Sequence, residues 1–229
     1  MERSSATQVH SLADVAWIEI REQILNGQLS PGETVGLKEQ AERLGISIMP
    51  VRDAVKRLQH EGLVVQIQQR EAYVAPLSLE NMEDVYSIRA ALESLAIERA
   101  CRNFGQEHFD RLSRVLDQFA GASENSDVRA AREFHRRFHL DLYALAGSPT
   151  LDRLIPPLID ATERYRVFSQ SLRGSVRQRT DEHQSLLLVC LSGDAEAARA
   201  QLASHLMRTV EDVRRSLELF AARRTEPRE

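Results

Sequence analysis

One amphipathic stretch, residues 45–58, constrains the fold of this chain more than any other part of the sequence. Apolar side chains recur at helical spacing in and just before it and predict one buried stripe: Leu44, Val51, Val55 and Leu58. Gly45 is suited to end a preceding helix, Ser47 to cap the next one through its hydroxyl, and Pro50 to lie in its first turn. Cations are expected on the opposite side: Arg52, Lys56 and Arg57. Such a helix suits insertion into a DNA major groove, and it also fits an ordinary surface helix.

The residues around this stretch predict a winged helix-turn-helix. We expect one helix from residue 12 to 25, halted by Asn26-Gly27, and a second at about 37–44. Two β-prone runs, 63–67 and 72–74, flank a polar segment and predict a two-stranded hairpin, the wing. Gly62 is placed to end the amphipathic helix, and Pro76 ends the domain, which we set at residues 1–76.

The rest of the chain, residues 77–229, predicts an all-α antiparallel bundle of about six helices. Ser78 is expected to cap the first of them, and Asp194 the last. The second is expected to stop at Gly121, and the fourth to begin at Pro149 and run to about Leu172. The remaining helices are expected at residues 127–146, 176–191 and 194–220.

Bulk properties limit the kind of partner. No apolar run approaches the ~20 residues that cross a bilayer, so we expect a cytoplasmic protein with no membrane contact. The net charge is −4, and residues 1–76 carry eight Lys and Arg against ten Asp and Glu. DNA binding would therefore need a few well-placed cations rather than a positive field. Cys101 and Cys190 lie in apolar helical patterns and are expected to be buried free thiols.

Several short motifs resemble a known family of bacterial transcription regulators, the GntR superfamily. In the N-terminal half these are Gly27-Gln-Leu-Ser-Pro-Gly32, Leu44-Gly-Ile-Ser47, Pro50-Val-Arg-Asp-Ala54 and Glu61-Gly-Leu63. The C-terminal half is similar to the ligand-sensing FCD domain of the FadR-type subfamily, through Arg89-Ala-Ala-Leu-Glu93, Phe138-His139, Ala146-Gly147, Glu182-His183, Gly193-Asp194 and His205-Leu206. The resemblance covers nearly the whole chain, with the motifs in the family's order and spacing.

The resemblance implies a homodimer that binds a palindromic operator on double-stranded DNA and releases it when a small organic acid enters the helical domain. We expect a repressor, associated with the bacterial nucleoid when bound to DNA. The residues expected to contact DNA are Lys38, Ser47, Pro50, Arg52, Lys56 and Arg70.

Two departures from the family bear on this DNA contact. Ile48-Met49 stand where the family carries Arg-Thr, and Glu71 stands at the glycine of the wing tip. Losing one base-reading Arg per half-site removes about 1–3 kcal/mol of discrimination unless another group compensates. Ile48 and Met49 alternatively pack within the domain.

Four histidines predict a metal site. His135 and His139 are four residues apart and face one side of a helix, while His183 and His205 lie on two other helices of the expected bundle. In the family the first of these positions is Asp or Asn, so His135 either joins the site or turns away. Imidazoles favour a divalent ion, Zn²⁺ first and Ni²⁺ second, with coordination left for an effector carboxylate. A lone helical His is more often merely solvated.

Three arginines are candidates for binding the effector: Arg89, Arg164 and Arg166. For each, a solvated or surface-paired Arg is the alternative. Two other functions stay open. One is a protein-interaction adaptor with a degenerate winged helix, favoured by Ile48, Met49 and Glu71. The other is a metal-dependent hydrolase, but it lacks a general base, because Glu182 is expected on a different helical face from His183. We therefore expect no catalytic residue and no enzyme.

Overall fold

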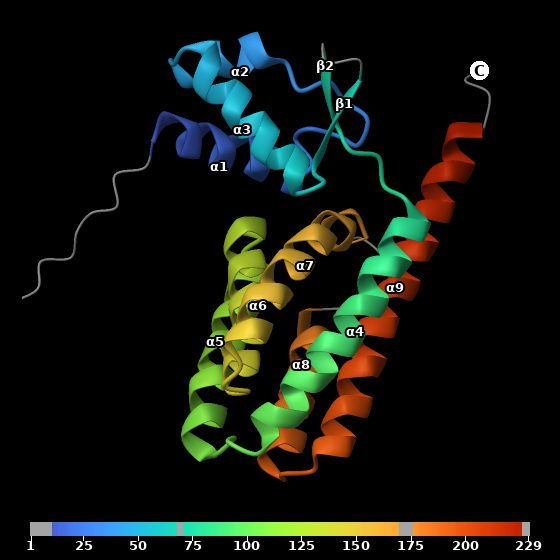
Figure 1. Ribbon diagram of the computed structural model, residues 1–229. Coiled ribbons are helices and arrows are strands. Elements are labelled where there is room, and N and C mark those ends of the chain that lie inside the picture. The colour runs from blue at the N-terminus through green and yellow to red at the C-terminus, as the bar shows by residue number, and fades with distance from the viewer. Residues whose placement is uncertain (1–10, 68–70, 170–175, 226–229) are drawn as a thin grey trace, which may run out of the picture. The chain divides into compact units, whose positions relative to one another are not determined.

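The computed structural model describes residues 11–67, 71–169 and 176–225 of the chain (Figure 1). The chain divides into two compact units, Met1–Pro76 and Leu77–Glu229. The predicted fold class, a winged helix-turn-helix followed by an all-α bundle, is confirmed.

The first unit contains three helices and a hairpin: α1 (Leu12–Leu25), α2 (Leu37–Leu44), α3 (Ile48–His60), β1 (Val64–Ile67) and β2 (Glu71–Val74). Ser11 caps α1 in a reciprocal capping box with Asp14. The side chain of each residue accepts a hydrogen bond from the backbone N–H of the other, so two N–H groups at the start of the helix have partners. The core of the unit is formed by apolar side chains of all three helices and of the wing, including Ile20, Leu25, Val51, Leu58, Leu63 and Val74. The orientation of α3 is therefore fixed by its buried face.

The wing is an antiparallel pair in which Val64 lies opposite Val74 and Ile67 opposite Glu71. The segment before α2 adds to the outer edge of this pair. The backbone N–H of Val35 donates to the carbonyl of Ala72 at 2.7 Å, and that of Val74 to Glu33 at 2.8 Å. This isolated β-bridge, between Thr34 and Tyr73, ties the wing to the segment just before α2.

The turn between α2 and α3 follows the sequence prediction in one residue and differs in another. Gly45 ends α2 in the left-handed region, with φ of 65°, where a side chain would be strained. Ser47 lies at the N-cap of α3, but among the described residues its hydroxyl makes no capping hydrogen bond. The predicted side-chain cap is thus wrong, and α3 begins with its amides open to an external partner.

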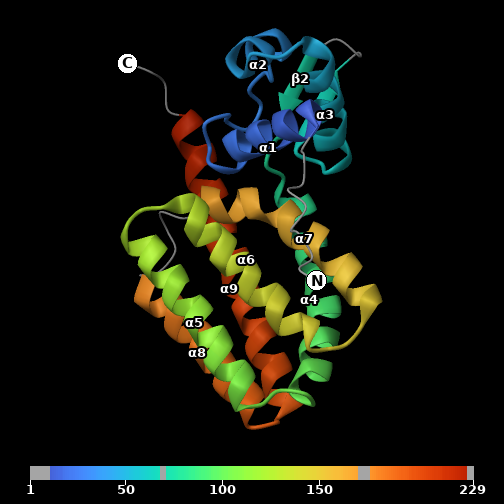
Figure 2. The same cartoon turned by 90° about the vertical axis from the view of Figure 1, so that its left-hand side faces the viewer.

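The second unit consists of α4 (Leu79–Cys101), α5 (Gln106–Glu124), α6 (Val128–Ala144), α7 (Pro149–Phe168), α8 (Val176–Leu191) and α9 (Ala195–Thr225). Helix α4 packs against α7 and α9, and α5 packs against α6 and α8 (Figure 2). Ion pairs at both ends of the α4–α9 contact, Glu83–Arg214 at 2.6 Å and Glu98–Arg199 at 3.4 Å, show that these two helices are antiparallel. The apolar core of the bundle includes Met82, Ile97, Leu116, Phe138, Leu187 and Leu202.

Some helix limits differ from those expected. Helix α5 continues through Gly121 to Glu124, because one glycine inside a helix costs only about 1 kcal/mol, and the chain turns instead at Ser126 with φ of 57°. Helix α7 is continuous through Pro156 and Pro157. Its expected end near Leu172 lies outside the described residues.

The two helix caps expected in this unit are present. Ser78 caps α4 through its hydroxyl, and Asp194 accepts from the backbone N–H of Ala197 at the start of α9.

Cys101 and Cys190 are buried free thiols, as expected. None of the helices in the described part of the chain is both long and apolar enough to cross a membrane.

Candidate metal centre and nucleic-acid interface

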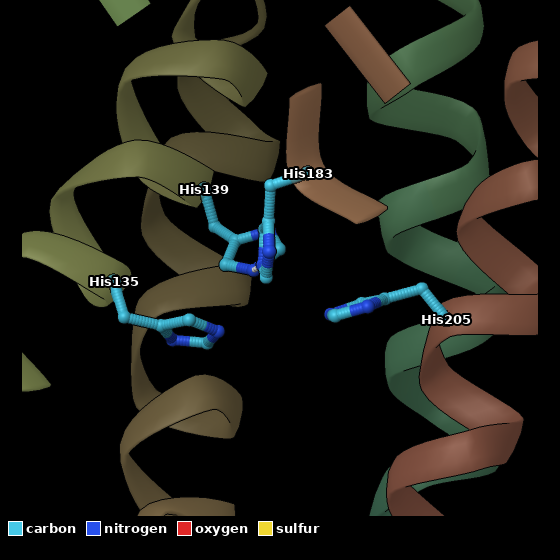
Figure 3. A group of neighbouring side chains, drawn as sticks. All are labelled: His135, His139, His183 and His205. Atoms are coloured by element: carbon cyan, nitrogen blue, oxygen red, sulfur yellow. Dashed lines mark hydrogen bonds between the residues drawn. The ribbon is translucent and has the colours of Figure 1, made fainter. Parts of the chain in front are cut away.

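Four histidine side chains point towards one another in the core of the bundle (Figure 3). His135 and His139 come from α6, His183 from α8 and His205 from α9. Each offers one nitrogen to a group of four atoms that all lie within 4.8 Å of one another, and each residue is between 1% and 8% exposed. His135 therefore joins the other three rings instead of turning away. Helix packing has collected donors that are up to 70 positions apart in the chain.

For two of the four rings, those of His139 and His183, hydrogen bonds on the outer nitrogen determine which nitrogen faces the cluster. The Nδ1 of His183 lies 2.6 Å from the carbonyl oxygen of Arg179, which only accepts, so Nδ1 carries the proton and Nε2 presents its lone pair. His139 has its Nδ1 3.3 Å from the hydroxyl of Tyr143. That hydroxyl donates to Glu93 at 2.7 Å and accepts from His139, so Nε2 of His139 also faces inwards.

A buried polar chain continues outward from Tyr143. Its acceptor, Glu93, receives the Nε–H of Arg89 at 2.6 Å, and Arg89 also donates to the hydroxyl of Thr162 at 2.7 Å. Burial alone lowers the pKa of Arg89, but the Glu93 carboxylate outweighs it and raises that pKa above its ordinary value. Burial and the Glu93 charge raise the pKa of Tyr143 well above its usual range. The tyrosine thus stays protonated and keeps its place between Glu93 and His139.

His205 is oriented by a carboxylate on the neighbouring helix. Its Nδ1 lies 3.5 Å from Glu182, which also pairs with Arg208 at 3.3 Å. Glu182 was expected on a different helical face from His183, and it contacts His205 and Arg208 of α9 instead of the ring of His183. Helical spacing within α8 does not reveal this contact, since it joins residues of two helices.

The four imidazoles fit a divalent metal ion. Burial, followed by the neighbouring His183 and His205 and the charges of Arg89 and Arg166, lowers the pKa of His139 well below its ordinary value. The neutral ring that remains is the form that binds a metal. His139 Nε2 and His183 Nε2 lie 3.3 Å apart, which is the ligand–ligand spacing of a tetrahedral site with bonds of about 2.0–2.1 Å. In a tetrahedral site all the ligand atoms would lie about 3.3–3.4 Å apart, so the wider spacings of this cluster, which reach up to 4.8 Å, would have to shorten by as much as about 1.5 Å on metal binding.

The arginines named as effector ligands lie on α4 and α7, and two of them hold carboxylates of the protein itself. Arg89 is bound to Glu93, and Arg166 pairs with Glu163. Arg164 donates to the Tyr165 hydroxyl at 3.3 Å and lies over that ring. Arg166 acts electrostatically on His139, so its charge is felt at the histidine cluster.

Sequence reasoning missed Arg179, one turn before His183 on α8. Its guanidinium lies 5.8 Å from the Phe119 ring, and its Nε is buried without a hydrogen-bond partner among the described residues. Burial and the charge of Arg166 lower the pKa of Arg179, against the attraction of Glu182. A guanidinium stays charged even so, and an anion beside the histidines would relieve this positive potential. The signal available in the sequence was the four-residue spacing from Arg179 to His183.

In the first unit, α3 and the wing enclose a cavity of about 300 Å³ whose lining includes Arg52, Lys56 and Gln66. Arg52 is exposed and makes no ion pair with any described residue. Lys56 pairs with Asp53 at 3.4 Å, and the Lys38 side chain is 87% exposed beside Glu42. Ser47 is exposed and Pro50 half-buried at the start of α3, while Arg70 lies outside the described residues.

Arg57 does not project freely from α3, as the sequence suggested. Its guanidinium stacks on the Trp17 ring at 3.5 Å and pairs with Asp14 at 3.2 Å. This cation therefore joins α3 to α1 within the unit. Ile48 and Met49 are 38% and 56% exposed, so the alternative that they pack inside the domain does not hold.

A winged helix with an exposed cationic helix face, followed by a bundle with a buried donor cluster, defines the class of ligand-responsive DNA-binding regulators. Comparisons with known proteins identify the family. Residues 13–74 match the family described as bacterial regulatory proteins, gntR family, and residues 84–208 match the FCD domain. The chain belongs to the GntR family of transcription regulators, with a C-terminal FCD domain.

Individual proteins agree with this assignment. The chain is 28% identical to the HTH-type transcriptional regulator BphR of Paraburkholderia xenovorans, over 90% of this chain and 86% of that protein. It is 24% identical to the HTH-type transcriptional repressor GlaR of Escherichia coli, over 91% and 98%. The solved structure of E. coli McbR/YncC has the same fold, with a TM-score of 0.77 at 23% identity over 91% of this chain and all of that one.

Proposed function

We propose that this protein is a transcription repressor in which α3 and the wing read an operator and the metal-centred bundle binds a small organic acid. The first unit is then the DNA-binding domain, and the second unit serves effector binding and dimerisation. The observation that carries the proposal is the convergence of four buried imidazoles beside Arg179, in the FCD domain of a GntR-family chain. Two relatives, GlaR and RspR, are named repressors, which supports the sign of regulation.

His135, His139, His183 and His205 would hold one divalent ion, Zn²⁺ or Ni²⁺ by their donor chemistry. When bound, the ion would supply a Lewis-acidic centre for an anionic oxygen of the effector. Four neutral ligands leave its two positive charges uncompensated, unlike a set that includes a carboxylate. Arg179 and Arg166, whose charges act on each other, add further positive potential. These charges favour an effector with at least one carboxylate.

We infer a homodimer because the expected operator is palindromic and has two half-sites. Two recognition helices must lie about 34 Å apart to read two half-sites one turn of DNA apart. Effector binding would then alter DNA affinity by favouring one arrangement of the dimer over another. We place this activity in the bacterial cytoplasm, on the nucleoid.

The test combines DNA binding with a ligand screen. The full-length protein is titrated against duplexes from the DNA flanking its own gene, by fluorescence anisotropy at fixed salt. Carboxylic acids are then screened by thermal shift, with and without a chelator. Nanomolar binding to one duplex, and release by an acid only in the metal-loaded protein, support the proposal. Release that is unaffected by the chelator contradicts the role of the metal.

Exposed Ile48 and Met49 favour a second candidate, a protein-interaction adaptor. It predicts no binding to any duplex at any salt concentration, whereas the regulator predicts binding that Arg52→Ala weakens. Hydrolysis at the histidine cluster has less support, because Glu182 is held by His205 and Arg208.

A further inference from the structure

Two large apolar side chains are exposed at the first two positions of α3. Ile48 is 38% exposed and Met49 is 56% exposed. The other apolar residues of this helix, Val51, Ala54, Val55 and Leu58, are between 0% and 4% exposed. The core of the winged helix is therefore filled without Ile48 and Met49, and their exposure has no role in the packing of the unit.

Their position is the one from which a recognition helix reaches base edges, since the N-terminal residues of that helix enter the major groove. Met49, Arg52 and Lys56 follow at three- and four-residue spacing and share one exposed face of α3. The apolar pair thus lies one turn before a cation that makes no ion pair with a described residue.

The chemistry of these side chains limits which bases they match. Neither offers a strong hydrogen-bond donor or acceptor. In the major groove only thymine presents a methyl group, whereas guanine and cytosine present polar groups there. An apolar side chain over those polar groups would displace their water without replacing the hydrogen bonds, which costs free energy.

We propose that Ile48 and Met49 read thymine methyl groups, so that each operator half-site carries T·A base pairs beside the position contacted by Arg52. The proposal rests on the proposed DNA-binding function. The adjoining Arg52 and Lys56, together with exposed Lys38 on α2, favour DNA as the partner. Two side chains are also far fewer than the about 20–30 residues per partner of a stable protein interface.

The experiment removes the methyl group alone. The operator is selected from randomised duplexes with the full-length protein, and each thymine in turn is replaced by deoxyuridine, which preserves base pairing. One or two positions per half-site are expected to lose about fourfold in affinity, equivalent to about 0.8 kcal/mol for one buried methyl group. In Met49→Ala or Ile48→Ala the same replacement should have no effect at the position that side chain contacts.

Leu12→Ala is the matched control, because Leu12 is a 55% exposed apolar residue of the same unit at the start of α1. It should keep the full penalty for deoxyuridine, and circular dichroism should show that all variants fold. Operator binding that is indifferent to deoxyuridine at every position would overturn the proposal while leaving DNA binding intact. A loss of affinity on deoxyuridine replacement that persists unchanged in both Met49→Ala and Ile48→Ala would overturn the proposal in the same way. Failure to bind any duplex would overturn this proposal and the proposed function together.

Discussion

The Nε2 atoms of His139 and His183 lie 3.3 Å apart in the core of the bundle, although 44 positions separate the two residues. Both rings donate their outer N–H, His139 to a tyrosine hydroxyl and His183 to a backbone carbonyl, so two lone pairs face each other. Such a contact is repulsive unless a cation or a proton lies between them. Burial and the neighbouring charges lower the pKa of His139 and disfavour the proton, which supports the proposed metal ion.

Removal of either histidine should therefore abolish metal binding. Metal analysis is expected to find about one divalent ion per chain in the wild type and none in His139→Ala or His183→Ala. When the free metal concentration is a hundredfold above Kd, metal binding stabilises the folded protein by about 2.7 kcal/mol. Removing the metal with a chelator should therefore lower the Tm by about 5–10 °C. His60→Ala, an exposed site on α3, should behave as wild type. An unchanged Tm and ligand response in metal-free protein would contradict the site.

Changing His135 should alter which metal is preferred. His135→Asp replaces a borderline imidazole with a hard, charged oxygen ligand, so Mn²⁺ affinity should rise about tenfold or more relative to Zn²⁺. Competition titration with a fluorescent chelator measures this ratio. His135→Ala removes the ligand without adding an oxygen and should weaken both metals. If His135→Asp and His135→Ala behave alike, His135 does not bind the ion.

Tyr143→Phe should weaken metal binding without touching a ligand directly. The hydroxyl orients His139 through its link to Glu93, and loss of such a partner costs about 10- to 100-fold in metal affinity. Tyr165→Phe is the matched control, because Tyr165 is also buried in the bundle but hydrogen-bonds to Ser78 and Asn81. It should lower stability with unchanged metal affinity. Equal metal affinities in the two variants would rule out a positioning role for Tyr143.

Arg179→Ala should reduce affinity for the acid found in the ligand screen by about 10- to 100-fold, the value of one charge-assisted hydrogen bond. Metal content should not change, because no side-chain atom of Arg179 is a metal ligand. Isothermal titration of the metal-loaded protein measures the effect. Arg177→Ala, on the same helix with a 92% exposed side chain, is the control and should bind the acid normally. Loss of metal from Arg179→Ala would show that its effect is structural.

Alanine substitutions at two arginines of α3, Arg52 and Arg57, should affect different properties, the first DNA binding and the second stability. Arg52→Ala is expected to weaken operator binding by about 1–3 kcal/mol. Arg57→Ala loses the stacking on Trp17 and should instead lower the free energy of unfolding by about 1 kcal/mol, with a change in tryptophan fluorescence. Anisotropy titrations and urea denaturation of both variants distinguish the two effects. A larger loss of operator affinity in Arg57→Ala than in Arg52→Ala would contradict these roles.

The sequence by itself determined the order and type of the helices and strands. Apolar spacing, the positive-φ position at Gly45 and caps such as Ser78 and Asp194 are local, so each can be recognised within a few residues of chain. The histidine pair on α6 was recognisable for the same reason, since four-residue spacing places both rings on one helical face. Errors arose where a local signal was weak, as at Gly121, or where a capping residue made no bond, as at Ser47.

Only the tertiary structure decided how residues on different helices pair. It brought His205 and His183 to the α6 histidines, joined Glu182 to His205 and Arg57 to Trp17, and left Met49 exposed. The physical reason is that helical periodicity determines which face of a helix a side chain occupies, but not which neighbour meets that face. That choice depends on the packing of the whole core, and it placed the buried charge of Arg89 and the half-buried charge of Arg179 near the histidine cluster.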